Sequence, residues 1–365
     1  MALELSPDVL AEVRGHTGFI TLNRPKALNA LSLQMVRDLM ACLLHWQSDP
    51  AVAQVAIRGS NKEGPFGAFC AGGDIRFLRE AALAGNPQLE DFFTEEYALN
   101  HLIHRYPKPY IAFMDGIVMG GGMGISQGAD VRIVTDRTRM AMPETIIGLF
   151  PDVGGGYFLS RCPGRVGEFL ALTGDSVTPD DAVHWGLADV KADAGALAGV
   201  WQALEQQHFV STQDAKAWAQ GFAQPLAAPS AEVAAQADQF FRGDSAQAIQ
   251  QALEAQPEGS WARATAATLR KRSPLMVAVV LEQIRRARGM TLAKDLRMER
   301  DMVRHCFHLR PGLASETVEG IRALAVDKDH QPRWNPARIE EVTPEQVAAF
   351  FASPWPAHAH PLAAL

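Results

Sequence analysis

Cysteine is scarce in this sequence, which has neither an excess of basic charge nor long apolar runs. The four cysteines stand far apart and form no C-x-x-C pair, so neither a disulfide framework nor a zinc knuckle is indicated. A formal net charge of −7 gives no general electrostatic reason to bind nucleic acid or an anionic membrane. The N-terminal stretch carries acids and no apolar run long enough for a signal peptide or a membrane span. We therefore expect a cytoplasmic protein with reduced thiols.

Glycine is concentrated in the most informative stretch, residues 109–156. Hydrophobic residues make up 47% of the 365 positions, enough to bury a substantial core. A β-rich apolar run over residues 110–119 ends in three glycines, and the pattern then predicts a helix and a second strand over residues 131–135. Glycines at such a junction allow a sharp turn and leave N–H groups of the first helical turn directed outward. We expect this turn to hold an anion or a developing oxyanion.

Two acids follow this turn, each directly after a proline. Glu144 follows Pro143, and Asp152 follows Pro151 just before another run of glycines. Because proline suits the first turn of a helix, both carboxylates are expected near helix N-termini, where the dipole favours the ionised form. An ionised acid beside an oxyanion-binding turn indicates acyl chemistry.

An earlier glycine turn repeats this logic. Gly72 and Gly73 stand before Asp74, and the pattern predicts a helix that begins at this aspartate. The turn is a source for a second N–H donor, although most Gly-Gly pairs merely turn the chain.

Two further motifs favour other chemistries less strongly. A helix predicted over residues 88–106 carries His101 and His104, but no further ligand stands at supporting spacing, so we predict no metal site. Residues 124–128 match the G-x-S-x-G pattern of serine hydrolases, which requires a strand directly before the serine. Here the turn comes earlier and places Ser126 inside a helix, which argues against a serine nucleophile.

The second half of the chain differs in composition. Residues 192–262 are rich in alanine and glutamine with helical periodicity, and large aromatic residues there argue against a flexible linker. We expect an added helical layer. After Pro274 a long helix leads into a basic group from Arg285 to Arg304, which is either a solvated helix face or a contact with ligand phosphates. The tail after residue 354 is expected to fray.

Four motifs taken together resemble the crotonase (enoyl-CoA hydratase/isomerase) superfamily. They are NRP and NAL at residues 23–31, FCAGGDI at 69–75, DGIVMGGGMGIS at 115–126, and MPETIIGLFPDVGGG at 142–156. The resemblance covers nearly the whole chain and implies an α/β fold. Residues 1–190 would form a crotonase-like spiral of ββα repeats with the CoA and catalytic site. Residues 191–365 would form a helical insert and a helical C-terminal region.

The resemblance implies that an acyl-CoA binds with its thioester carbonyl between the N–H groups of Gly73 and Gly121. In the hydratases of the superfamily two glutamates hold the catalytic water, one at the position of Glu144 and one at the position of Gly124. This chain therefore departs from the hydratase pattern at Gly124.

The hydrolase subgroup of the superfamily fits the chain better. Its acids fall on Glu96, Glu144 and Asp152, which are all present, and the FPDVGGG run is characteristic of that subgroup. The implied activity is hydrolysis of an acyl-CoA thioester such as 3-hydroxyisobutyryl-CoA, in valine catabolism. Glu144 would act either as the nucleophile, giving a mixed anhydride, or as the base that activates water. Asp152 would hold the substrate 3-hydroxyl or the water, and Glu96 would assist in the same pocket.

The resemblance also implies where coenzyme A binds. The expected contacts come from two loops and the later glycine turn, namely Lys26, Ala27, Leu28, Ala68, Ala71, Gly72, Asp74, Ile75 and Gly120. Lys26 would meet a phosphate as a point charge. Coenzyme A is part of the substrate, and no metal or redox cofactor is implied. A homo-oligomer is possible, because trimers and hexamers are common in the superfamily.

Two alternatives stay open. The chain could hydrate or isomerise an enoyl-CoA with Glu144 as the sole acid/base, or it could be an inactive protein that binds acyl-CoA. Gly124 argues against hydration, and the presence of Glu96, Glu144 and Asp152 argues against an inactive binding protein.

Overall fold

A computed structural model describes residues 3–365, and these residues form two compact units that alternate along the chain. Unit 1 extends to Gly73 and also contains Ala98–Ala141 and Val177–Pro229; unit 2 contains Asp74–Tyr97, Met142–Ser176 and Ser230–Leu365. The two predicted domains, residues 1–190 and 191–365, are continuous stretches of the chain, whereas each of these units combines several separate segments. The predicted domain boundary at residue 190 therefore stays a prediction.

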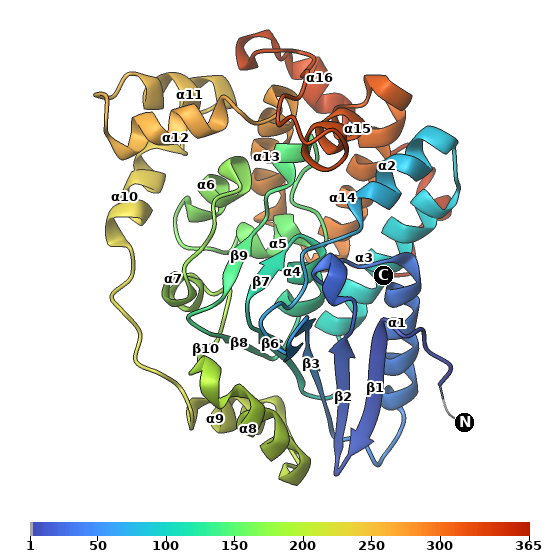
Figure 1. Ribbon diagram of the computed structural model, residues 1–365. Helices are drawn as coiled ribbons and strands as arrows, with labels where there is room; N and C mark the ends of the chain where they lie inside the picture. The colour runs from blue at the N-terminus through green and yellow to red at the C-terminus, as the bar shows by residue number, and fades with distance from the viewer. Residues whose placement is uncertain (1–2) are drawn as a thin grey trace. The chain divides into compact units, whose positions relative to one another are not determined.

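A six-stranded sheet forms the centre of unit 1 (Figure 1). In spatial order its strands are β1 (Val9–Arg14), β2 (Thr17–Leu22), β3 (Gln54–Arg58), β6 (Tyr110–Met114), β8 (Val131–Val134) and β10 (Val190–Lys191). β1 is antiparallel to β2, and the other neighbours are parallel. Two small ladders pair β4 (Ser60–Asn61) with β5 (Gly64–Pro65) and β7 (Ile117–Met119) with β9 (Arg139–Ala141). Parallel neighbours need long connections, which the helices supply.

Helices are present in both units. Unit 1 contains α1 (Leu33–Gln47), α4 (Gly121–Gln127), α7 (Pro179–His184), α8 (Leu197–Ala203) and α9 (Thr212–Gln220). Unit 2 contains α2 (Ile75–Ala84), α5 (Gly155–Leu159), α6 (Val166–Thr173), α10 (Ala231–Phe240), α11 (Ala246–Glu254), α12 (Trp261–Leu269), α13 (Pro274–Ala287), α14 (Leu292–His308), α15 (Glu316–Ile321) and α16 (Pro344–Ala349). α3 (Gln88–His104) begins in unit 2 and ends in unit 1. The predicted α/β class is confirmed.

Helices cover both faces of the sheet in unit 1. Because neighbouring residues of a strand point to opposite faces, Gly18 and Phe19 of β2 show what lies on each side. A Cβ on Gly18 would lie 2.5 Å from the ring of Trp46 in α1, so only glycine fits beneath that helix. On the other face the rings of Phe19 and Trp201 of α8 have centroids 4.8 Å apart.

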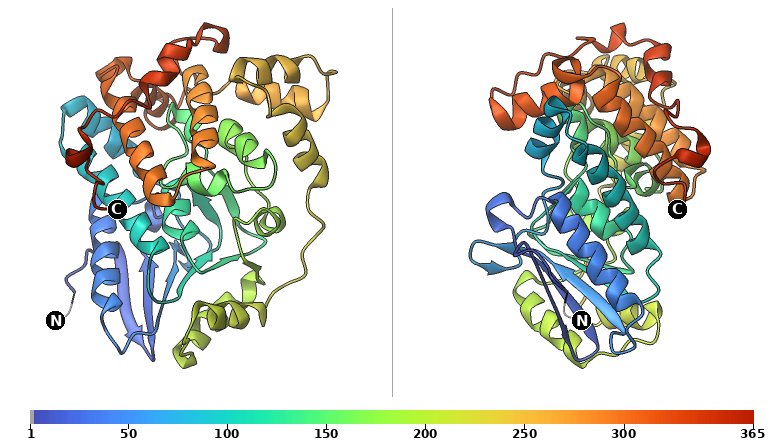
Figure 2. Two further views of the ribbon diagram at one scale, coloured as in Figure 1. Left: turned by 180° about the vertical axis from the view of Figure 1, so that it is seen from behind. Right: turned by 90° about the vertical axis from the view of Figure 1, so that its right-hand side faces the viewer.

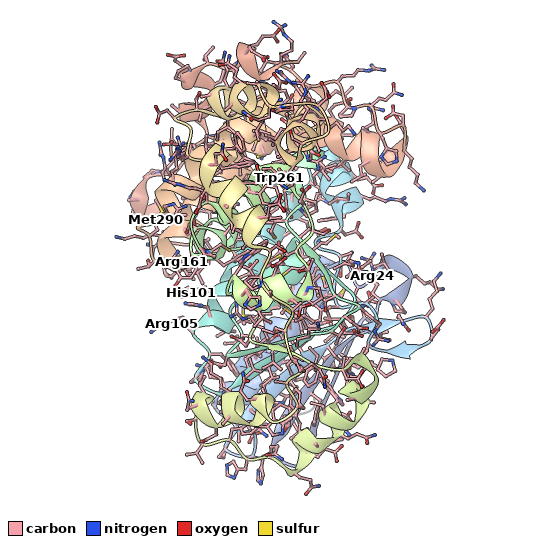
Figure 3. All side chains as sticks on the ribbon, turned by 90° about the vertical axis from the view of Figure 1, so that its left-hand side faces the viewer. Arg24, His101, Arg105, Arg161, Trp261 and Met290 are labelled. Carbon is pink, nitrogen blue, oxygen red and sulfur yellow. The ribbon has the colours of Figure 1, made fainter. Side chains whose placement is uncertain are left out.

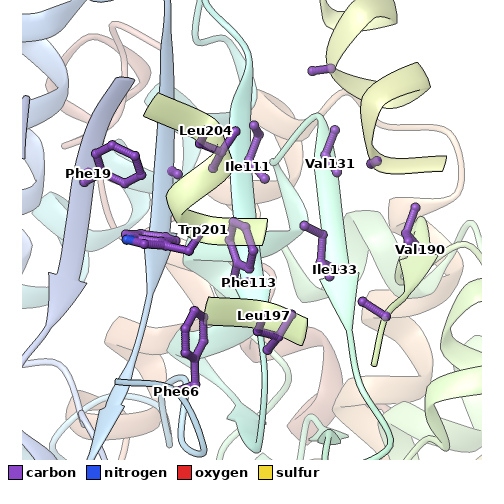
Figure 4. Packing of buried hydrophobic residues seen from close by; sticks show 14 of the residues in the cluster. Phe19, Phe66, Ile111, Phe113, Val131, Ile133, Val190, Leu197, Trp201 and Leu204 are labelled. Atoms are coloured by element: carbon purple, nitrogen blue, oxygen red, sulfur yellow. The ribbon is translucent and has the colours of Figure 1, made fainter. Parts of the chain in front are cut away.

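A hydrophobic cluster of unit 1 lies on the face covered by α8 (Figure 4). Phe113 and Ile133 of the sheet meet Trp201 and Leu204 there. The large anchors after residue 192 therefore fill a core, as predicted. The expected single helical layer over residues 192–262 is nevertheless divided between the two units, and residues 223–230 have no regular structure. Two prolines in this stretch account for the break, because proline cannot continue a helix.

Unit 2 is organised around α13 and α14, which lie side by side (Figure 2). The short α5 packs against both helices. The expected fraying of the C-terminal tail is wrong, since Leu362 is 3% exposed and its carbonyl accepts a hydrogen bond from Arg297 of α14 at 3.1 Å. Among the residues that the structure describes, no helix is long and apolar enough to span a membrane.

Candidate functional site

The two predicted glycine turns lie side by side in unit 1. A Cβ on Gly72 would be 3.2 Å from the carbonyl oxygen of Met119 and 3.6 Å from the amide nitrogen of Gly121. The amide of Met119 also donates to the carbonyl of Cys70 at 3.0 Å. Gly72 has φ +105° and Gly120 has φ +50°, conformations that favour glycine. The glycines therefore stand where two segments, far apart in the sequence, approach each other closely.

The amides of Gly73 and Gly121 are available as donors. Gly121 is the first residue of α4, so its N–H has no acceptor within the helix. Across residues 3–365 neither amide donates a hydrogen bond to a protein acceptor. Main-chain donors in this state are suited to an oxyanion.

The two loops predicted to bind coenzyme A are joined to each other in unit 1. The carbonyl of Leu28, a residue with φ +50°, accepts a hydrogen bond from the amide of Ala71 at 3.0 Å. The buried side chain of Asn29 donates to the carbonyl of Ala68 at 3.0 Å. These contacts fix the main chain of both loops.

The remaining predicted CoA contacts are divided between the units. Lys26 and Ala27 lie in the 3₁₀ turn Pro25–Ala27 of unit 1, where Lys26 is exposed. Asp74 and Ile75 begin unit 2, where Asp74 caps α2 by accepting from the amide of Phe77 at 3.3 Å, as predicted.

The three predicted acids gather in unit 2. Glu96, Glu144 and Asp152 are 2%, 7% and 6% exposed. Burial raises the pKa of Asp152 to about 6, and burial together with the charge of Asp152 raises the pKa values of Glu96 and Glu144 well above their usual range. The expected effect of the helix dipole on Glu144 is outweighed, because desolvation and the charge of Asp152 favour its protonated form, whereas a pKa of about 6 still leaves Asp152 mostly ionised at neutral pH.

Glu144 begins the 3₁₀ turn Glu144–Ile147, directly after Pro143 as predicted. α15 packs against this turn so closely that a Cβ on Gly320 would lie 2.3 Å from the carbonyl carbon of Ile147. Thr317 of α15 donates to the carbonyl of Gly148 at 2.7 Å. Helix α15 thus fixes the backbone that carries Glu144.

Asp152 lies in a turn two residues before Gly154, the N-cap of α5, and thus near a helix N-terminus as predicted. The backbone of Val153 and Gly154, with φ +55° and +87°, places the start of the helix at Gly155. One oxygen of Asp152, Oδ2, accepts a hydrogen bond from the hydroxyl of Tyr97 at 2.8 Å.

Sequence reasoning missed several residues of this cluster. Tyr97 follows Glu96 in α3 and carries no motif. Asp295 and Glu299 of α14 are fully buried, although charged residues on a helix are usually solvated. The only available signal was their spacing of four residues, which places two acids on one helix face.

The basic group around α14 is engaged in protein contacts. Arg288 pairs with Glu168 at 2.7 Å, and Arg304 pairs with Glu90 at 2.9 Å. The buried Arg300 donates to Thr94 at 3.0 Å. These contacts favour a structural role over a contact with ligand phosphates.

Two further arginine contacts join parts of unit 2. Arg161, which lies outside the basic group and over the ring of Tyr157, donates to the carbonyl of Met290 at 2.8 Å (Figure 3). Arg285 donates to the carbonyl of Asp244 at 2.8 Å.

The alternative chemistries find no support in the geometry. Ser126 lies inside α4 and donates to the carbonyl of Gly122 at 2.8 Å, so it is not at a nucleophile elbow. Within the described part of the chain, no group of three or more His, Cys, Asp or Glu side chains is arranged to hold a metal ion.

Comparison with known proteins gives relatives over nearly the full length. The sequence profile of the family described as "Enoyl-CoA hydratase/isomerase" matches residues 17–351. The 3-hydroxyisobutyryl-CoA hydrolase, mitochondrial, of Rattus norvegicus is 39% identical over 351 residues, which are 95% of this chain and 89% of the relative. The protein of the same name from Homo sapiens is 37% identical over 362 residues, 96% of this chain and 90% of the relative.

Two solved structures are similar over a comparable length. A carnitinyl-CoA dehydratase from Mycobacterium thermoresistibile has a TM-score of 0.85 and 39% identity, covering 95% of this chain and 97% of its own. An enoyl-CoA hydratase from Rhodobacter sphaeroides 2.4.1 has a TM-score of 0.84 and 36% identity, covering 95% and 98%. The chain thus belongs to the enoyl-CoA hydratase/isomerase family and has the crotonase fold that its four motifs predicted.

Proposed function

We propose that this protein hydrolyses 3-hydroxyisobutyryl-CoA to 3-hydroxyisobutyrate and coenzyme A, a step of valine breakdown. The observation that carries the proposal is the buried cluster of Glu96, Glu144 and Asp152 in unit 2. Within residues 3–365, Oε1 of Glu96 and Oε2 of Glu144 are buried without a hydrogen-bond partner. Buried polar atoms are normally paired, so these oxygens are suited to a substrate hydroxyl or a water molecule.

The relatives support a hydrolase over a hydratase. The curated relatives carry the name 3-hydroxyisobutyryl-CoA hydrolase, whereas the similar solved structures are titled as a dehydratase and a hydratase. Hydratases of the superfamily need a second glutamate at the position of Gly124, and glycine has no side chain to hold water. A carboxyl group at Asp152 supplies the polar function that hydrolysis of a hydroxyacyl thioester requires.

Hydrolysis of a thioester develops negative charge on the carbonyl oxygen. We assign its stabilisation to the amides of Gly73 and Gly121, which have no protein acceptor among the described residues. Preorganised donors of this kind act without reorganising during the reaction.

Glu144 is the proposed catalytic carboxyl group, as nucleophile or as general base. Both roles need its ionised form, whereas burial and the charge of Asp152 favour the protonated form. We therefore expect the rate to rise with pH until Glu144 is ionised. Asp152 would bind the 3-hydroxyl or the attacking water, and Glu96 would complete the pocket.

Coenzyme A is proposed as the handle of the substrate. Lys26 would meet a phosphate, and the main chain of Leu28, Ala68 and Ala71 would receive the adenine and pantetheine groups. We propose a reaction without metal or redox cofactor, so dialysis against EDTA should leave the rate unchanged.

A panel of acyl-CoA thioesters tests the proposal. We expect release of free thiol from 3-hydroxyisobutyryl-CoA at a kcat/KM far above that for isobutyryl-CoA. A site that hydrogen-bonds a hydroxyl can reject an analogue without it by roughly 10⁴-fold, because its buried polar groups would be left unpaired. Loss of absorbance from crotonyl-CoA as the dominant activity would identify a hydratase instead. Tight binding of acyl-CoA by calorimetry without turnover would identify a binding protein.

The cellular compartment is proposed from the cysteines, and the oligomeric state from the family. The four cysteines are all free and buried, which suits a reducing compartment such as the cytoplasm. The curated relatives are named as mitochondrial, so localisation of a tagged protein is the deciding measurement. A homo-oligomer, as a trimer or hexamer, is proposed from the family and is tested by light scattering.

A further inference from the structure

Helix α14 of unit 2 carries two buried acids that the proposed reaction does not use. Asp295 and Glu299 are both 0% exposed and stand one turn apart on the same face of the helix. Burial of a carboxyl group is costly, so such a pair is expected to make defined contacts.

Both acids accept hydrogen bonds from the turn that follows Asp152. Glu299 accepts from the amide of Gly154 through Oε2 at 2.8 Å and from the amide of Gly156 through Oε1 at 2.9 Å. Asp295 accepts from the amide of Tyr157 through Oδ2 at 2.8 Å. The amides of Gly154, Gly156 and Tyr157, all at the start of α5, therefore donate to one face of α14.

Helix α13 extends this network to the other side of Asp152. The amide nitrogen of the Gln283 side chain, Nε2, donates to the carbonyl of Pro151 at 2.7 Å and to Oε1 of Glu299 at 3.2 Å. The backbone is thus held immediately before Asp152 and again two residues after it.

The turn has a backbone that needs such support. Val153 is β-branched and has φ +55°, a conformation that costs roughly 1–3 kcal/mol and persists only when the surroundings fix it. At Gly156 a Cβ would lie 2.5 Å from Oδ1 of Asp295, so the turn and α14 are in direct contact.

The burial of the pair also shifts its pKa values. Burial raises the pKa of Asp295 to about 6, and burial with the charge of Asp295 raises the pKa of Glu299 well above its usual value. Arg161 partly offsets this at Asp295, while the amides of Gly154 and Gly156 partly offset it at Glu299.

We propose that Asp295 and Glu299 are positioning residues, which fix the turn that carries Asp152 by accepting its amide hydrogen bonds. The expected loss of kcat in the variants rests on the proposed hydrolase function. The expected loosening of the turn, seen as faster amide exchange, does not.

Four variants test the proposal. Glu299→Gln leaves one acceptor where two amides donate, and its new NH₂ group faces an N–H. Asp295→Ala removes the acceptor for Tyr157, whereas Asp295→Asn keeps one. Asp301→Asn is the matched control, because Asp301 lies on the same helix and accepts instead from Ser353 of the C-terminal tail at 2.8 Å.

The kinetic readout separates positioning from binding. We expect Glu299→Gln to lower kcat roughly 10- to 100-fold with KM changed less than about threefold, since a displacement of about 1 Å at a catalytic group has such an effect. Asp295→Ala should lose more activity than Asp295→Asn, and Asp301→Asn should match the unmodified protein. A Glu299→Gln enzyme with unchanged kcat overturns the proposal.

Hydrogen exchange gives a readout that needs no activity. The amides of Gly154, Gly156 and Tyr157 should exchange faster in the Glu299→Gln protein and at the normal rate in the Asp301→Asn control. Unchanged exchange in the Glu299→Gln protein overturns the proposal. If the Glu299→Gln protein does not fold, the exchange of the Tyr157 amide is measured in the Asp295→Ala protein, where it should also be faster than normal. If the unmodified protein hydrolyses no thioester, the proposed function fails and exchange alone decides the role of the pair.

Discussion

The glycine turns of unit 1 present polar groups of the main chain, whereas the acid cluster of unit 2 presents polar groups of side chains. An amide N–H is neutral at every pH of interest, and its direction is set by the backbone. A buried carboxyl group changes charge with its surroundings, and here burial and the neighbouring charge raise the pKa values of Glu96, Glu144 and Asp152. The turns therefore supply a fixed field, while the cluster supplies groups whose charge depends on pH.

Glu144→Gln is the strongest test of the acid cluster. We expect hydrolysis to fall by roughly 10²- to 10⁴-fold, the usual contribution of a catalytic acid or base, while coenzyme A still binds. Stability should be equal or higher, because glutamine has no charge to desolvate. Thiol release and thermal unfolding measure both effects. The control is Glu80→Gln on the exposed surface of α2, which should change neither. Normal turnover in the Glu144→Gln protein would remove this residue from the mechanism.

Gly121→Pro is the corresponding test of the glycine turns. Gly121 is the first residue of α4, a position that proline tolerates, so the change removes the N–H with little effect on the helix. We expect the rate to fall by roughly 10²- to 10³-fold, the effect of losing one oxyanion donor. Unlike the Glu144 variant, this loss should be the same at every pH. Circular dichroism checks the fold, and a rate within tenfold of normal would contradict the assignment.

The glycine turns and the acid cluster also differ in how much of their structure could be predicted from the sequence. Glycine turns follow from local backbone rules, so Gly72 and Gly120 were placed correctly, and so was the capping residue Asp74. The family motifs predicted the crotonase fold, which is confirmed, and pointed to three acids whose catalytic roles stay a prediction. The raised pKa values of those acids were not predictable, because desolvation depends on every element packed around them. The helix-dipole argument considered only the local chain.

Contacts between residues far apart in the sequence could not be predicted either. Tyr97 and Asp152 are separated by 55 positions, and Asp295 lies 138 positions from Tyr157, so no local pattern connects either pair. The predicted fraying of the tail failed for the same reason, since Arg297 of α14, 65 positions away, binds the carbonyl of Leu362.

Tyr97→Phe tests the pH dependence of the cluster with a smaller expected effect. The hydroxyl of Tyr97 lowers the pKa of Asp152, so its removal should raise that pKa above about 6. Because the folded protein holds this proton more tightly than the unfolded chain, stability falls as pH rises from 3.8 to about 6. In the Tyr97→Phe protein the fall should extend to higher pH. Urea unfolding between pH 4 and pH 8 measures it, and an Asp152→Asn protein should lack this component. An identical pH profile in the Tyr97→Phe protein would contradict the contact.

Ser126→Ala should have the smallest effect, and it separates the glycine turns from the serine-hydrolase pattern that overlaps them. Ser126 is buried in α4, and among residues 3–365 its hydroxyl donates only to the carbonyls of Gly122 and Met123 in the preceding turn. Losing such a bond costs about 1 kcal/mol, and the better helix propensity of alanine offsets part of this. We expect thiol release within roughly twofold of normal and a small change in stability. A loss as large as that of Glu144→Gln would make the hydroxyl the nucleophile, and α4 would then have to act through its side chain and not through its first amide.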